Sequence, residues 1–225
     1  MLTLREKESV KLILTDTNFI DNKDSIRNYL NRIDEARKER ILSNKLIEDK
    51  KRLTAAGLLL DYMCKEEEVS QPVFGKEKHG KLFLTNREDI KFNLSHSGKY
   101  AVCAYGRYEV GVDIQEKRVT SESMVARFLN QIEMEELPED LTQRISKVNR
   151  LWCIKESFIK SIGLGLLYNM RDCIVELEKG RIIDTTGHYD IAYFKDFVIE
   201  PDYHLSICSM HADLPDNYNI IDFTK

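Results

Sequence analysis

The chain has 225 residues, with 34 Lys and Arg against 38 Asp and Glu, a formal net charge of −4 and a pI near 5.8. This length suffices to bury a core without disulfides, and the acidity excludes a generally basic nucleic-acid-binding surface, although a local basic site stays possible. The five cysteines form no CxxC pair and lie among apolar neighbours, which favours buried thiols over disulfides or zinc ligands. Residues 1–14 carry acidic residues where a secretory signal would have an apolar core, and no apolar run could span a bilayer, so we expect a cytoplasmic protein.

The first predicted elements are two charge-rich helices. Residues 31–52 hold eight Lys or Arg and five Asp or Glu, and apolar residues continue at helical spacing beyond them. This spacing predicts helices over about 31–43 and 46–64. Such a charge run most often forms a solvated helix face. Residues 65–91 are polar and contain turn residues, which predicts a loop with one or two short strands.

Two strands come next. Residues 100–105 are apolar and residues 109–115 alternate apolar with polar, which predicts a hairpin with its turn at 106–108. The helix that follows is expected to begin at Ser121 or Ser123, because either side chain can cap it. The later predicted elements are helices over 124–137 and 142–162 and strands over 173–178, 181–184, 189–200 and 203–210.

The order of elements, helices and then strands, occurs twice. The two blocks also end alike, with Tyr-Ala-Val-Cys-Ala at 100–104 and His-Leu-Ser-Ile-Cys at 204–208. Such an internal repeat indicates two halves that pack their sheets together. We therefore predict an α+β fold of two similar halves, residues 1–114 and 115–225, each a small antiparallel sheet with helices.

Asp113 and Gln115 share one face of the strand predicted over 109–115. Two oxygen donors at positions i and i+2 suit a hard cation such as Mg²⁺, and Gly111 beside them leaves room for a ligand or a backbone to approach. A common alternative is an aspartate that only caps a turn.

Trp152, Glu156 and Lys160 are spaced by four, so they share one helix face. An exposed Glu–Lys pair would be the ordinary reading. The apolar residues around the motif instead indicate a largely buried helix, in which a glutamate and a lysine need partners such as a metal and a phosphate.

The segment Phe-Asn-Leu-Ser-His-Ser-Gly at 92–98 offers Ser95, His96 and exposed backbone N–H groups, which are donors suited to phosphate oxygens. A serine-protease interpretation is disfavoured, because adjacent side chains on an extended chain point apart. A structural turn histidine is the plain alternative.

In this order and spacing, the three motifs resemble those of Sfp-type 4'-phosphopantetheinyl transferases. The resemblance implies a two-half enzyme with its active site between the halves. It implies Mg²⁺-dependent transfer of 4'-phosphopantetheine from coenzyme A to a serine of an apo acyl, aryl or peptidyl carrier protein, with release of adenosine 3',5'-bisphosphate. Such enzymes serve nonribosomal peptide and polyketide biosynthesis. We expect a monomer that acts without nucleic acid or membrane partners.

The resemblance also implies a role for each matched residue. Asp113, Glu156 and Gln115 would hold the metal, and Glu156, Lys160 and His96 would act in catalysis. The positions implied for coenzyme A are Arg37, Arg40, Arg52, Gly80, Lys81, Asn93, Ser95, His96, Asp113 and Lys160. Two residues depart from the family pattern: Gln115 replaces a glutamate, and Leu82 replaces a proline after Gly80-Lys81.

Carrier docking is expected on the helix near 121–132, with Met124, Arg127 and Phe128 as candidates. The main alternative is a catalytically weakened relative that only binds coenzyme A or a carrier, for which Gln115 is the one hint. A general Mg²⁺-dependent nucleotide enzyme is disfavoured, because no P-loop or dinucleotide fingerprint is present. Nucleic-acid binding through residues 32–52 is disfavoured by the overall acidity.

Overall fold

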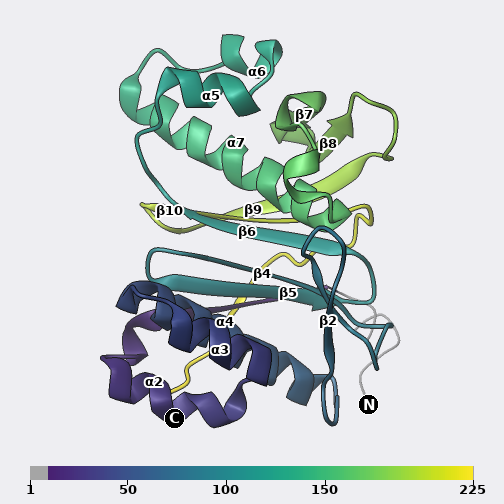
Figure 1. Ribbon diagram of the computed structural model, residues 1–225. Coiled ribbons are helices and arrows are strands. Elements are labelled where there is room, and N and C mark those ends of the chain that lie inside the picture. The colour runs from purple at the N-terminus through teal and green to yellow at the C-terminus, as the bar shows by residue number, and fades with distance from the viewer. Residues whose placement is uncertain (1–9, 225) are drawn as a thin grey trace.

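Two sheets pack face to face, and each carries helices on its outer side, in a computed structural model that describes residues 10–224 (Figure 1). The strands are β1 (Lys11–Asp16), β2 (Phe74–Lys76), β3 (Leu82–Leu84), β4 (Lys91–Ser97), β5 (Tyr100–Gly106), β6 (Val110–Glu116), β7 (Cys173–Glu176), β8 (Arg181–Asp184), β9 (Ala192–Glu200), β10 (Tyr203–Ser209) and β11 (Asn219–Ile220). The helices are α2 (Lys23–Tyr29), α3 (Glu35–Ser43), α4 (Ile47–Glu66), α5 (Glu122–Phe128), α6 (Gln131–Glu135) and α7 (Leu141–Ile162).

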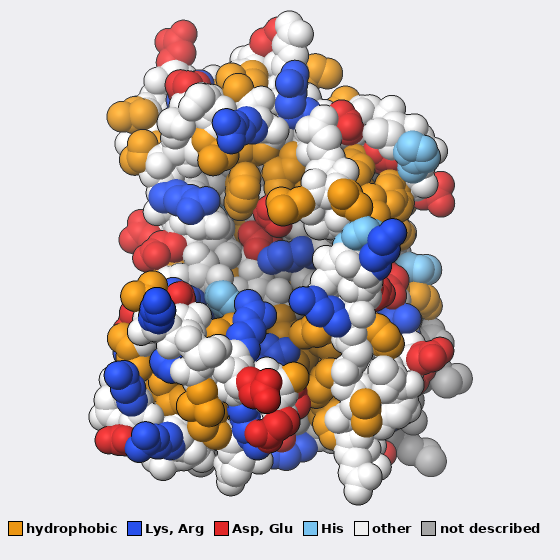
Figure 2. Space-filling view, in the orientation of Figure 1, with side chains coloured by type: hydrophobic (Ala, Val, Ile, Leu, Met, Phe, Trp, Pro, Cys, Tyr) orange, Lys and Arg blue, Asp and Glu red, His pale blue; other side chains and the backbone are white. Residues whose placement is uncertain are grey.

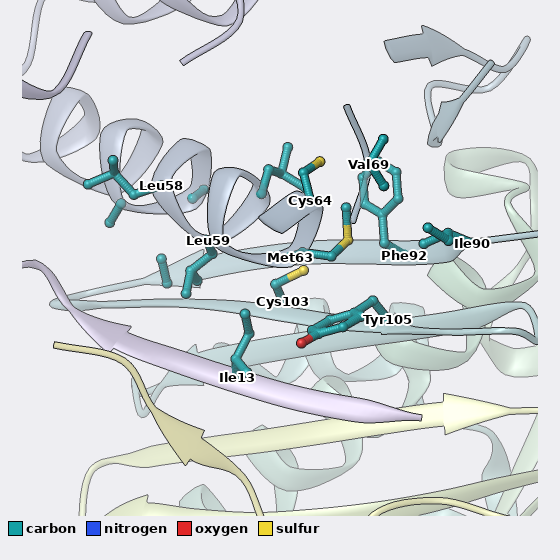
Figure 3. Packing of buried hydrophobic residues seen from close by; sticks show 14 of the residues in the cluster. Ile13, Leu58, Leu59, Met63, Cys64, Val69, Ile90, Phe92, Cys103 and Tyr105 are labelled. Carbon is teal, nitrogen blue, oxygen red and sulfur yellow. The ribbon is translucent and has the colours of Figure 1, made fainter. Parts of the chain in front are cut away.

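The first sheet has the strand order β11-β1-β5-β4 and is antiparallel except for the pair β1 and β11. Helix α4 covers its outer face. Leu59 and Met63 of α4 pack with Cys103 and Tyr105 of β5 in one buried cluster (Figure 3). Burial of this apolar helix stripe is the main force that holds the first helical layer on its sheet.

The second sheet has the order β6-β10-β9-β8-β7 and is antiparallel throughout. Helix α7 covers its outer face, where Ile154 and Phe158 are fully buried. The helix begins at Asp140, whose side chain accepts the N–H of Gln143, and it ends at Gly163 in the left-handed conformation. The structure thus confirms the predicted α+β fold with two helix-and-sheet halves.

The side chains of strand β6 alternate between the two faces of its sheet. Val112 and Ile114 face the other sheet in the buried cluster between the sheets, whereas Gly111 and Asp113 face α7. A Cβ atom on Gly111 would fall on the backbone of Ser157, so only glycine lets the helix approach this closely. The expected close approach at Gly111 is therefore that of a backbone.

Several predicted elements match the structure and others do not. The helices expected over 31–43 and 46–64 are α3 and α4, and Ser121 caps α5 as one of the two candidates. The single helix predicted over 124–137 is wrong. It breaks into α5 and α6, because the Asn130 side chain accepts the N–H of Glu133 and starts a new helix with a capping box.

The predicted division after residue 114 runs through β6. Strand pairing joins all of β6 to β10 of the second sheet, and it returns β11 to β1 of the first sheet. All five cysteines are buried and free. Within residues 10–224, no helix is long and apolar enough to cross a bilayer. The expectation for residues 1–14 lies mostly outside the described residues.

Candidate active site

A cavity of about 460 Å³ lies between the two halves. Figure 2 shows acidic and basic side chains gathered in this hollowed waist. Nearly every residue predicted for the site lines it: Arg37, Arg40, Gly80, Lys81, Asn93, Ser95, His96, Asp113, Gln115, Glu156 and Lys160. Arg52 instead lines a neighbouring hollow of about 400 Å³, which shares His96 and Gln115 with the cavity.

The floor of the cavity is a three-residue contact between the halves. Asp113 of β6 is buried, and its Oδ1 lies 2.6 Å from Nζ of Lys160 on α7. Ser95 of β4 donates its hydroxyl to the same Oδ1 at 2.7 Å and accepts Lys160 Nζ at 3.0 Å. Both partners contact Oδ1. Within residues 10–224, no hydrogen bond to Oδ2 of Asp113 is seen, so this oxygen can accept a further ligand.

Helix α7 presents its functional side chains through a spacing of four. Trp152, Glu156 and Lys160 all line the cavity, as the sequence predicted. Phe128 packs edge-on against Trp152, with ring centroids 4.9 Å apart, which fixes the indole at the cavity wall. Phe128 is thereby buried, so its expected role in carrier docking is wrong.

Glu156 is partly buried beside a second carboxylate. Burial raises the pKa of Glu156, the nearby Asp113 raises it further, and Lys160 opposes this. Two carboxylates that repel each other in one cavity are what a divalent cation would stabilise. No cluster of three or more His, Cys, Asp or Glu side chains suited to a metal occurs in residues 10–224.

Gln115 lines both hollows, and its amide nitrogen donates to the carbonyl of Glu116 at 2.8 Å. Among the contacts of residues 10–224, the amide oxygen of Gln115 has no hydrogen-bond donor, so it can accept a bond from a ligand or bind a cation. The donor set of Asp113, Glu156 and Gln115 fits Mg²⁺, which takes one or two carboxylates and accepts neutral oxygens for the remaining positions.

The opposite wall of the cavity is basic. Arg37 and Arg40 of α3 line it, and Arg40 is exposed while Arg37 contacts Asp34 at its own helix N-terminus. His96 keeps an exposed surface toward solvent. Desolvation by the cavity wall, followed by the charges of Arg52, Lys160 and Arg40, lowers its pKa to about 4. The ring is therefore neutral at pH 7.

Sequence reasoning missed a set of contacts that joins the halves. Strands β4 and β6 are edge strands of different sheets and lie against each other. Asn93, Ser95 and Ser97 of β4 accept the backbone N–H groups of Val112, Ile114 and Glu116 at 3.1, 3.3 and 3.0 Å. These polar side chains at alternate positions of β4 mark a polar strand face in the sequence, but they do not identify the partner strand. They fix the register of Asp113 against Ser95.

Lys81 has partners of its own. Its Nζ donates to Glu109 at 2.6 Å and to the carbonyl of Ser161 at the end of α7 at 2.7 Å. The adjacent Gly80 adopts a positive φ of 100° at the tip of the β2–β3 hairpin. Lys81 thus ties this hairpin to the second half at the cavity wall.

Residues 109–208 match the family described as ACPS, the 4'-phosphopantetheinyl transferase superfamily. The chain is 29% identical over 155 residues to the 4'-phosphopantetheinyl transferase Sfp of Bacillus subtilis (strain 168). The aligned region covers 68% of this chain and 69% of that protein. The chain is also 27% identical over 199 residues to the L-aminoadipate-semialdehyde dehydrogenase-phosphopantetheinyl transferase of Xenopus laevis. That aligned region covers 77% of this chain and 61% of that protein. Asp113, Glu156 and Lys160 all fall within the residues that match the 4'-phosphopantetheinyl transferase superfamily, and the chain is similar to the Sfp-type transferases.

Proposed function

We propose that this protein transfers the 4'-phosphopantetheine group of coenzyme A to a serine of an apo carrier protein and releases adenosine 3',5'-bisphosphate. One observation supports this most. A single cavity between the halves brings two carboxylates, Asp113 and Glu156, next to the cation Lys160 and a basic wall. Phosphoryl transfer depends on positioning and on neutralising charge, and these groups supply both.

Coenzyme A would bind with its phosphates on the basic side of the cavity. Arg52, with Arg37 and Arg40 nearby, would receive the 3'-phosphate of the nucleotide, and Lys160 would face the diphosphate. His96 would donate a ring N–H to a phosphate oxygen. Before coenzyme A binds, desolvation and the charges of Arg52, Lys160 and Arg40 lower its pKa to about 4.

Asp113 and Glu156 would hold Mg²⁺ beside the diphosphate, with Gln115 as a neutral oxygen donor. Bound there, Mg²⁺ would neutralise charge on the phosphate oxygens. Gln115 contributes no charge of its own, so the two carboxylates carry the electrostatic attraction for the cation.

In the transfer, the carrier serine oxygen bonds to the β-phosphorus, and the bond from that phosphorus to the oxygen of the nucleotide phosphate breaks. Glu156 would take the serine proton, directly or through a water. A positioned base of this kind contributes about 10²–10⁴-fold to the rate of such a transfer. Lys160 would stabilise the charge that develops on the leaving oxygen.

The test is intact mass spectrometry of apo carrier domains incubated with the protein, coenzyme A and MgCl₂. We expect each accepted carrier to gain one phosphopantetheine, and this gain to stop with EDTA or with Glu156→Gln. Peptidyl, aryl and acyl carriers would be tried side by side to identify the class preferred.

The opposite result is also informative. If no carrier gains mass although coenzyme A binds in calorimetry, the protein is a binding relative without transfer activity. Gln115 is the residue that would then account for the loss, because it replaces a charged ligand. Restored transfer by Gln115→Glu would locate the defect at the metal site.

Both walls of the cavity come from one chain, which supports action as a monomer. Light scattering during size-exclusion chromatography is the measurement. A dimer mass with full activity would contradict the monomer and leave the transfer reaction unaffected.

A further inference from the structure

The turn between β4 and β5 lies next to the arginine proposed for the 3'-phosphate. Arg52 donates from Nη1 to the carbonyl of Gly98 at 3.1 Å, and its Nη2 pairs with Asp49 on the same helix. Arg52, Gly98 and Asp49 line the same hollow of about 400 Å³. Two partners on different elements thus fix the plane of the guanidinium, and one of them is the carbonyl of the turn.

The turn itself is held from the other half of the molecule. The hydroxyl of Tyr203, at the start of β10, accepts the N–H of Lys99 at 3.2 Å and donates to Glu116 of β6 at 3.0 Å. Burial, together with the bond to Glu116, raises the pKa of Tyr203, so the hydroxyl keeps its proton as a donor.

The fit between Tyr203 and the turn is close. Gly98 has a positive φ of 52°, and a Cβ atom at this position would clash with the hydroxyl of Tyr203. The ring of Tyr203 also packs edge-on against Tyr100, with centroids 5.0 Å apart. The hydroxyl of Tyr100 points elsewhere and donates to Glu200 at 2.8 Å. The two tyrosines therefore differ in one respect that matters here, because only the hydroxyl of Tyr203 contacts the turn.

We propose that Tyr203 is a positioning residue for nucleotide recognition: its hydroxyl holds the Gly98–Lys99 turn so that the Gly98 carbonyl orients Arg52 toward the 3'-phosphate of coenzyme A. This rests on the proposed function and on the role given there to Arg52. The contact crosses the boundary between the halves, since Arg52 on α4 and the β4–β5 turn belong to the first half and Tyr203 on β10 to the second. Selection of the nucleotide would thus depend on how the halves are docked.

The experiment compares Tyr203→Phe with the matched control Tyr100→Phe. Each variant keeps its ring and loses one hydroxyl. Carrier phosphopantetheinylation is followed with coenzyme A and with 3'-dephospho-coenzyme A, and the preference is the ratio of the two kcat/KM values. We expect Tyr203→Phe to lower this preference about fivefold through KM for coenzyme A, with kcat nearly unchanged, because a net hydrogen bond of typical strength is lost. Tyr100→Phe should leave the preference unchanged.

A double-mutant cycle with Arg52→Ala tests whether the effect passes through the arginine. We expect Arg52→Ala to lower the preference more than Tyr203→Phe, and the double variant to match Arg52→Ala alone. Calorimetry measures the same preference without turnover, as the ratio of the Kd values for AMP and for adenosine 3',5'-bisphosphate. We expect this ratio to fall in Tyr203→Phe and to fall further in Arg52→Ala.

Several results would overturn the inference. One is an unchanged preference in Tyr203→Phe, and another is an equal loss of kcat/KM with coenzyme A and with 3'-dephospho-coenzyme A. A third is a double variant in which the separate losses of preference of Tyr203→Phe and Arg52→Ala multiply. A wild-type protein that uses neither donor would overturn the proposed function as well. Transfer with normal discrimination in Tyr203→Phe overturns the inference alone.

Discussion

Lys160 and Asp113 form a close charged contact in the cavity, with Nζ 2.6 Å from Oδ1. The pair joins helix α7 to strand β6, both in the second half, and Ser95 of the first half bonds to both members. This network of three residues therefore fixes the positions of the carboxylate and the ammonium group, and it also joins the two halves.

Asp113→Asn is expected to lower the rate of transfer by about 10²–10³-fold, because it removes the charge that would hold the cation and anchor Lys160. The asparagine still reaches Ser95, so the melting temperature should change little. Carrier mass against time and circular dichroism measure the two effects. Asp196→Asn is the control, since that carboxylate lies in the same sheet but pairs with Arg150 outside the cavity. Full activity in Asp113→Asn would remove this residue from the metal site.

Gln115→Glu is expected to keep or raise activity and to lower the Mg²⁺ concentration needed for half-maximal rate. A third carboxylate adds a charge to a donor set that now has two. Transfer rates over a range of MgCl₂ give the result. A variant that becomes inactive while still folded would show that Gln115 does not lie at the metal.

The shared face of α7 could be predicted, because a spacing of four on a helix fixes which side chains lie together. The three residues so identified all line the cavity. The bonds from β4 to β6 could not be predicted in the same way. They depend on two edge strands of different sheets meeting, which no local pattern of Asn93, Ser95 and Ser97 specifies.

Other misses have equally local causes. The sequence prediction lacks strand β1 and helix α2. Both elements are short, and β1 is stabilised by pairing with β5, which lies some 90 residues along the chain. The burial of Phe128 follows from its contact with Trp152, which is tertiary. Arg52 was assigned by resemblance, but only the structure separates its hollow from the main cavity.

Asp184 offers a pH test remote from the cavity. Burial acts to raise the pKa of Asp184, but bonds from Thr186, Tyr168 and backbone N–H groups outweigh it and lower the pKa to about 2. The ionised form therefore stabilises the folded state above the usual pKa of 3.8, and this stabilisation is lost as the pH falls toward 2.

Asp184→Asn should accordingly lower the melting temperature by about 5 °C at pH 7, with transfer unaffected. The difference from the wild type should persist at pH 5 and shrink between about pH 4 and pH 2. Thermal melts over this range measure it. A difference that stays constant down to pH 2 would mean that the carboxylate charge contributes nothing.

Two lysines of α7, Lys155 and Lys160, have opposite surroundings. Lys155 is fully buried and pairs with Glu133 at 2.6 Å, and it also donates to the carbonyls of Met170 and Cys173. Lys160 is partly exposed in the cavity. We therefore expect Lys155 to maintain the fold and Lys160 to serve the reaction.

Lys155→Met should cost about 3–5 kcal/mol of unfolding free energy, because Glu133 would be left buried and uncompensated. Activity per folded molecule should be retained, and adding Glu133→Gln should recover part of the stability. Lys160→Met should instead lower kcat by about 10²-fold or more. Its loss of stability should be smaller than that of Lys155→Met, because Lys160 is partly exposed, although buried Asp113 loses its partner. Urea unfolding and carrier transfer, measured on the same preparations, separate the two. Equal losses of stability in both variants would contradict the distinction, because they would show that Lys160 also holds α7 on the sheet.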